Sequence, residues 1–134
     1  MSLFDKTVNG LQTALTMRQL KQNVTTANIA NAETPGYQAK KLDFEGALER
    51  ALDMDGLREM STSSEDHMTV GGHTAKVKAD IYNNPEGAVS NDGNTVDLEK
   101  EMSTLSENAI MYKAALQLIN KKLAQLKYAA SDGR

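Results

Sequence analysis

Residues 98–130, LEKEMSTLSENAIMYKAALQLINKKLAQLKYAA, decide the fold of this 134-residue chain. Their apolar side chains recur at alternating steps of four and three without a miss: Leu98, Met102, Leu105, Ala109, Tyr112, Leu116, Ile119, Leu123, Leu126 and Ala130. This heptad pattern is typical of a coiled-coil seam. At 1.5 Å per residue the helix would be about 50 Å long, so it needs a partner helix along most of its length.

Local signals at both ends support this helix. Asp97 stands where an N-cap belongs, and Glu99 and Glu101 lie near the positive end of the helix dipole. Lys121, Lys122 and Lys127 lie toward the negative end. Heptad pattern, cap and charge therefore predict the same element.

Composition favours helices over a β-sandwich. Only 40% of the residues are hydrophobic and 4% aromatic, so burial must come from many aliphatic side chains in long contacts. The net charge of −3 offers no basic surface for nucleic acid, and the acidic side chains concentrate in residues 43–97. The absence of Cys excludes disulfides and thiolate chemistry and leaves the compartment open.

A second long helix is expected over residues 3–30. Its apolar residues form two stripes, the second displaced from the first: Phe4, Val8, Leu11 and Leu15, then Met17, Leu20, Val24 and Ala27. The break predicts one neighbour for the first half of the helix and another for the second half. Because these residues form no continuous apolar run, neither a signal peptide nor a membrane span fits.

The middle of the chain carries weaker signals. Residues 42–54 fit a short helix, residues 53–74 a polar loop, and residues 74–82 alternate as a single strand or hairpin arm would. We therefore expect a mainly α protein whose long terminal helices pack as a coiled-coil-like layer around a small irregular or β middle. The expected division is one discontinuous helical core, residues 1–36 and 95–134, and a middle segment, residues 37–94.

Residues 27–37, ANIANAETPGY, predict a chain reversal after the first helix. Pro35 fixes φ at the second position of a type II turn, and Gly36 supplies the positive φ that the third position needs. Asn28 and Asn31 can hydrogen-bond the carbonyls freed at the helix end. Two interpretations stay open: a simple stop signal, or a turn that also contacts another subunit through Asn28, Asn31, Thr34, Pro35, Gly36 and Tyr37.

This segment resembles the ANxxNxxTPGY signature of the flagellar rod and hook family, and residues 40–48 and 93–130 are similar to the same family. The resemblance implies a structural subunit of the proximal rod of the bacterial basal body, in a helical rod around the export channel. It implies a periplasmic location, type III export without a cleaved signal, and contacts with other rod proteins and the base adaptor to the membrane ring. The expected interface positions are Leu11, Leu15, Leu20, Val24, Leu105, Tyr112, Leu116, Ile119, Leu123 and Leu126.

Phe44 and Leu48 resemble the aromatic-x-x-x-aliphatic export-gate element of this family's early substrates. Phe4 and Val8 match the same loose pattern. The alternative is that Phe44 and Leu48 are i, i+4 neighbours that pack a short helix onto the subunit.

Nothing in the sequence predicts an enzyme, a cofactor, a metal or a small-molecule substrate. His67 and His73 are six residues apart in a polar loop, and the acidic Asp43, Glu45 and Glu49 fit an exposed helix face. Two alternatives to a rod subunit remain, a coiled-coil adaptor and an export chaperone. A defined dimer would favour the adaptor, and a fixed-ratio complex with a secreted protein would favour the chaperone.

Overall fold

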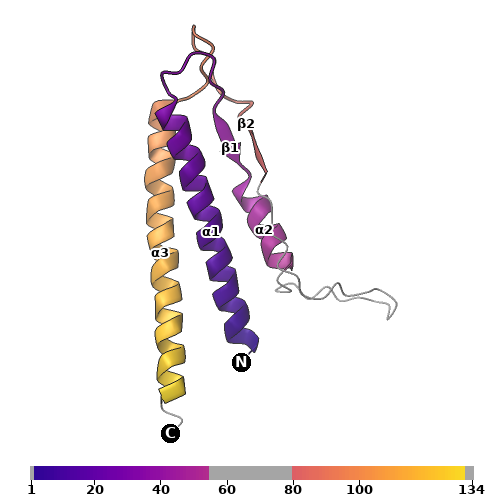
Figure 1. The fold of residues 1–134 in the computed structure, drawn as a ribbon, viewed down its shortest axis with the longest axis vertical. Helices are drawn as coiled ribbons and strands as arrows, with labels where there is room; N and C mark the ends of the chain where they lie inside the picture. Colours follow the sequence, from indigo (N-terminus) through magenta and orange to yellow (C-terminus); the bar gives the residue numbers. More distant parts are fainter. Residues whose placement is uncertain (1, 55–79, 132–134) are drawn as a thin grey trace, which may run out of the picture.

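A computed structural model describes residues 2–54 and 80–131. In these residues the chain forms, in order, α1 (Ser2–Ala30), β1 (Lys40–Leu42), α2 (Phe44–Met54), β2 (Ile81–Asn83) and α3 (Leu98–Ser131). The helices α1 and α3 pack side by side and antiparallel, with both chain ends at the same end of the molecule (Figure 1). The prediction of a mainly α fold built on two long terminal helices is confirmed.

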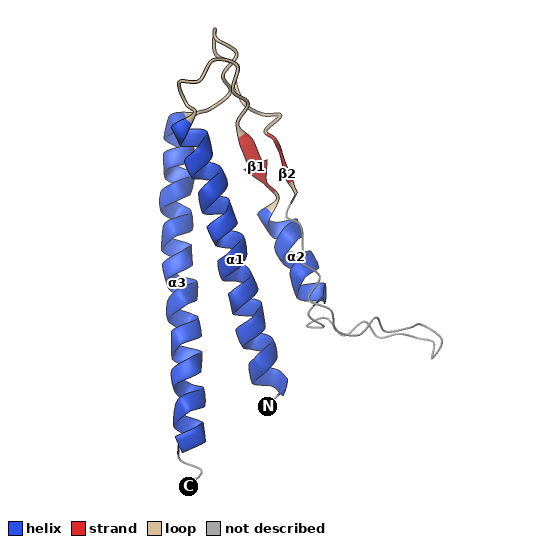
Figure 2. Cartoon of the chain, viewed as in Figure 1, coloured by secondary structure: helices blue, strands red, loops and turns tan. Residues whose placement is uncertain are grey.

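The two strands form a small antiparallel sheet in which Lys41 lies opposite Tyr82. This sheet and α2 lie on the side of α1 away from α3 (Figure 2). The expectation that each half of α1 meets a different neighbour is therefore wrong. The neighbours of α1 contact different faces of this helix. α3 runs beside most of its length on one face, and α2 and β1 cover another face. Two buried faces explain why its apolar residues form displaced stripes.

The buried core is small and lies on both sides of α1. Its hydrophobic members are Met17, Ala39, Leu42 and Ala47, and its polar members are Thr25, Asn28, Asn94 and Asn108. Half of the buried side chains among the described residues are thus polar, and each of these needs hydrogen-bond partners. No buried side-chain nitrogen or oxygen in the described part of the chain lacks a hydrogen-bond partner.

The seam of α3 against α1 differs from the predicted one. Leu105, Tyr112, Ile119 and Leu126 are half-buried, as a seam requires. The residues that alternate with them on the more buried face are Glu101, Asn108, Ala115 and Lys122, in place of the apolar residues predicted there. We call those displaced residues the outer row: Met102, Ala109, Leu116, Leu123 and Ala130. Met102, Leu116 and Leu123 are 55%, 40% and 48% exposed, so the outer row lies beside the seam.

The middle of the chain is partly as expected. α2 matches the predicted short helix within two residues, and Asp43 caps it by accepting a hydrogen bond from Gly46 N at 3.2 Å. Of the predicted strand over residues 74–82, the described part contributes Ile81 and Tyr82 to β2. His67, His73 and most of the predicted polar loop lie outside the described residues. Within the described ranges, no helix has both the length and the apolar character to cross a membrane.

Candidate functional site

The turn after α1 has the geometry that its sequence predicts. Gly36 has a φ of 72°, and Tyr37 N donates to Thr34 O at 3.2 Å. Pro35 and Gly36 thus occupy the central positions of a type II turn, which confirms the expected chain reversal. Gly93, with a φ of 81°, faces this turn, and a Cβ at Gly93 would lie 3.4 Å from Gly36 Cα.

Asn28 has a different role from the predicted one. Its side chain is 1% exposed and points at β1, where Nδ2 donates to Lys40 O at 2.7 Å and Oδ1 accepts from Lys40 N at 2.9 Å. The hydroxyl of Tyr37 donates to the same Oδ1 at 3.1 Å. The expectation that Asn28 caps a freed helix carbonyl is wrong, because α1 continues to Ala30. The amide of Asn28 instead replaces the peptide of a neighbouring strand and fixes β1 on α1.

Asn31 does meet the capping expectation. Its Nδ2 donates to Ala27 O at 2.8 Å, and its Oδ1 accepts from Thr34 Oγ1 at 3.1 Å. Asn94, which the sequence did not single out, contacts the turn after α1 from across the chain. It is 3% exposed, and its Nδ2 lies 2.9, 3.0 and 2.8 Å from the carbonyl oxygens of Asn31, Ala32 and Thr34. One buried amide therefore binds three carbonyls of the turn that follows α1.

Further bonds join the motif turn to the segment before α3. Gly36 N donates to Asp92 O at 2.9 Å, and Thr95 N donates to Tyr37 O at 3.0 Å. Ala39 N donates to Thr95 Oγ1 at 2.8 Å. We call this region, residues 31–39 with residues 90–97, the junction. It links the end of α1 to the start of α3, where Asp97 Oδ1 accepts from Lys100 N at 3.2 Å and confirms the predicted N-cap.

Burial raises the pKa of Tyr37 above its ordinary value of 10.0, and the negative charge of Glu101 raises it further. Both effects disfavour the phenolate. The neutral hydroxyl is the form that donates to Asn28 Oδ1, so Tyr37 keeps this bond through the neutral pH range.

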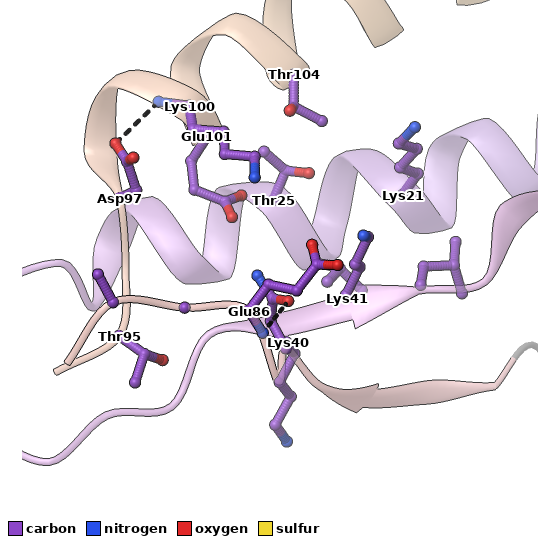
Figure 3. Close-up of a pocket in the computed structure, with 15 residues that line it drawn as sticks. Lys21, Thr25, Lys40, Lys41, Glu86, Thr95, Asp97, Lys100, Glu101 and Thr104 are labelled. Atoms are coloured by element: carbon purple, nitrogen blue, oxygen red, sulfur yellow. Dashed lines mark hydrogen bonds between the residues drawn. The ribbon is translucent and has the colours of Figure 1, made fainter. Parts of the chain in front are cut away.

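A polar cleft of about 280 Å³ lies between α1, β1, the segment before α3 and the first turns of α3. Its rim carries both charge signs, with Lys21, Lys41 and Lys100 among the bases and Glu86 and Glu101 among the acids (Figure 3). In residues 2–54 and 80–131 no three His, Asp or Glu side chains group as metal ligands would. Of the three carboxylates expected on an exposed helix face, Asp43 serves as the cap of α2.

Phe44 joins α2 to α1 through two cations. The guanidinium carbon of Arg18 lies 4.7 Å and the ammonium of Lys21 5.5 Å from the centre of the Phe44 ring. Phe44 and Leu48 are both half-buried one turn apart on α2, so the packing interpretation holds for the folded chain. The side chain of Phe4, the competing candidate, lies outside the described part.

The ten candidate interface positions fall into two groups. Leu116 and Leu123 are exposed on the outer row. The other eight are half-buried within the subunit: Leu11, Leu15, Leu20, Val24, Leu105, Tyr112, Ile119 and Leu126. Most of the predicted interface positions are therefore partly covered within one chain, whereas all members of the outer row except Ala109 are exposed.

The sequence of this chain is similar to those of known proteins. A family model described as flagella basal body rod protein matches residues 9–38, which include most of α1 and the motif turn. The flagellar basal body rod protein FlgB of Bacillus subtilis is 34% identical over 134 residues, 100% of both chains. FlgB of Aeromonas hydrophila is 36% identical over 92% of this chain and 91% of that relative, and FlgB of Escherichia coli is 31% identical over 91% of each. The chain therefore belongs to the FlgB family of flagellar basal body rod proteins, a family of structural proteins.

Proposed function

We propose that this chain is a subunit of the proximal rod that assembles with its own copies and with other rod proteins through α1 and α3, around the export channel. Family membership supports a structural role in the basal body rod. The observation that carries the finer proposal is the outer row. Met102, Leu116 and Leu123 stand exposed at intervals of seven or fourteen residues along one line of a helix about 50 Å long.

Such a row is unusual on a chain that works alone. Full burial of an exposed Leu or Met side chain stabilises by roughly 1.5–3 kcal/mol. The three residues are 40–55% exposed, so about half of this remains, and covering them offers a neighbour about 2–4 kcal/mol. Ile110 and Leu118, 69% and 54% exposed, add apolar surface elsewhere on α3. Exposed apolar side chains in such a row support an interface with another protein.

The two-part division of the chain follows from the same proposal. The layer of α1 and α3, residues 1–36 and 95–134, would form the rod core, and residues 37–94 would lie outside it. The base adaptor and the next rod protein would contact the ends of this layer, with the motif turn as one contact. The chain would reach the periplasm through the flagellar type III apparatus, with Phe44 and Leu48 presented to the export gate while the chain is unfolded.

Sedimentation of the purified chain tests the assembly proposal. The native chain should be a monomer when dilute and polymerise, or co-assemble with other rod proteins, as concentration rises. Replacing Leu116 and Leu123 by Ser should prevent the large species, while Gln117→Ser, at an exposed polar position of α3, should not. A defined dimer at all concentrations would instead support the coiled-coil adaptor. A fixed-ratio complex with a secreted protein would support the export chaperone.

A further inference from the structure

α3 carries two overlapping heptad seams, and one of them faces α1. Both contain Leu105, Tyr112, Ile119 and Leu126. In the apolar seam, these four residues alternate with the outer row. In the seam that faces α1, they alternate with Glu101, Asn108, Ala115 and Lys122. At 100° per residue the two seams differ by a rotation of α3 of about 50°. Apolar burial alone would favour the unused seam, so another interaction must oppose that rotation.

Asn108 is the buried residue of α3, at 2% exposure. Its Nδ2 donates to Arg18 O at 2.8 Å and to Gln22 Oε1 at 3.1 Å, and its Oδ1 accepts from Arg18 Nη1 at 3.4 Å. These bonds join the middles of α1 and α3 through polar groups on both helices. Rotation by about 50° to the apolar seam would turn Asn108 away from α1 and break its hydrogen bonds to Arg18 O and Gln22 Oε1, with no other amide brought into its place.

Arg18 is itself fixed from the other side of α1. Its guanidinium lies over the ring of Phe44 on α2, so one side chain contacts both neighbours of α1. This contact limits the ability of Arg18 to follow a rotated α3. The matched polar groups thus oppose the rotation that apolar burial favours.

We propose that Asn108 is a specificity-determining residue that selects the seam α3 presents to α1 and so keeps the outer row uncovered. A single buried Asn in a coiled-coil seam is a known means of fixing register at some cost in stability. The choice of seam is a property of one chain. Only its consequence, an outer row available to the next subunit, rests on the proposed function.

Thiol labelling of the dilute monomer tests the proposal, because the chain has no Cys of its own. Single cysteines are placed at Ala115, half-buried in the seam, or at Leu116, 40% exposed on the outer row. Each is combined with native Asn108, with Asn108→Leu, or with Asn120→Leu. Asn120 is exposed on the same helix, so it is the matched control.

With native Asn108 the outer-row thiol should react faster than the seam thiol. In Asn108→Leu the ratio of the two rates should invert, because α3 turns its apolar seam toward α1, and Asn120→Leu should leave the ratio unchanged. Retention of the native ratio in a helical Asn108→Leu chain would overturn the proposal.

Asn108→Ala provides a second variant that adds no bulk to the seam, and it should show the same inversion. Loss of the helical circular dichroism signal in both variants would also overturn the proposal. It would mean that Asn108 is needed for folding itself, with no alternative seam available to the chain.

Discussion

Asn28 and Lys40 exchange two hydrogen bonds, from Asn28 Nδ2 to Lys40 O at 2.7 Å and from Lys40 N to Asn28 Oδ1 at 2.9 Å. A side chain of α1 thereby pairs with the backbone of β1 as a strand would. The strand pair contains three residues per strand, too few for independent stability. Its position beside α1 therefore depends on this amide.

Asn28→Ala should lower the free energy of unfolding by about 2 kcal/mol, because it removes three part-buried hydrogen bonds, two to the backbone of Lys40 and one to the hydroxyl of Tyr37. Asn31→Ala removes a cap at the exposed helix end and should cost only about 0.5–1 kcal/mol. Urea unfolding followed by circular dichroism compares the two. Equal losses would show that Asn28 acts only as a second cap.

Gly36→Val should destabilise the chain by at least about 1–2 kcal/mol, because a β-branched residue resists the φ of 72° found there. No atom lies within 4 Å of a Cβ built at Gly36, so the cost comes from the backbone conformation and not from a clash. Gly36→Asn, whose side chain tolerates positive φ, should lose much less. Thermal unfolding of the two variants makes the comparison, and similar losses would point to steric crowding.

Tyr37 should make stability fall at high pH. Because burial and Glu101 raise its folded-state pKa above 10.0, its contribution is complete below pH 10 and is lost as pH rises through the folded value. Absorbance titration should place its ionisation above that of a free tyrosine, and Tyr37→Phe should remove this part of the pH dependence. Glu101→Gln should lower the pKa only part of the way, since burial is the larger cause. A full return to 10.0 would contradict that order.

Phe44→Ala should reduce the secreted pool of the chain and leave protein in the cytoplasm, if the unfolded segment presents Phe44 to the export gate. Arg18→Ala removes the cation over the ring but keeps Phe44, so it should weaken the folded chain without reducing secretion. Immunoblots of the two pools, with Phe4→Ala alongside, identify the export element. Normal secretion of Phe44→Ala together with failed assembly would leave Phe44 only a packing role.

Local signals predicted the helices well. The heptad repeat predicted the helix α3, and the Asp97 cap and the Pro35–Gly36 turn have the expected geometry. All three signals depend on residues close in sequence. β1 was missed because three residues offer almost no alternation, and the strand is held by Asn28. A periodicity argument cannot detect an amide that substitutes for a strand.

The seam and the junction were predicted less well for a related reason. The apolar count favoured Leu116 and Leu123 as seam residues, whereas bonds from Asn108 to Arg18 and Gln22 select the neighbouring face. Asn94 lies in a segment that signals only turns, yet it contacts the turn after α1 some sixty residues earlier. Both depend on polar partners distant in sequence, and one sequence gives no pairing information of that kind.

The amount of Leu116→Asp chain in purified basal bodies tests the rod proposal most directly. Leu116 is 40% exposed in the subunit, so the charge should leave the fold and export intact and become unpaired only when a neighbour covers the outer row. The matched control, Gln117→Asp, adds the same charge to an exposed polar position. If the rod proposal holds, Leu116→Asp is secreted but absent from basal bodies, with motility lost, while the Gln117→Asp chain assembles and its cells swim. Incorporation of Leu116→Asp at the native level in motile cells would contradict it.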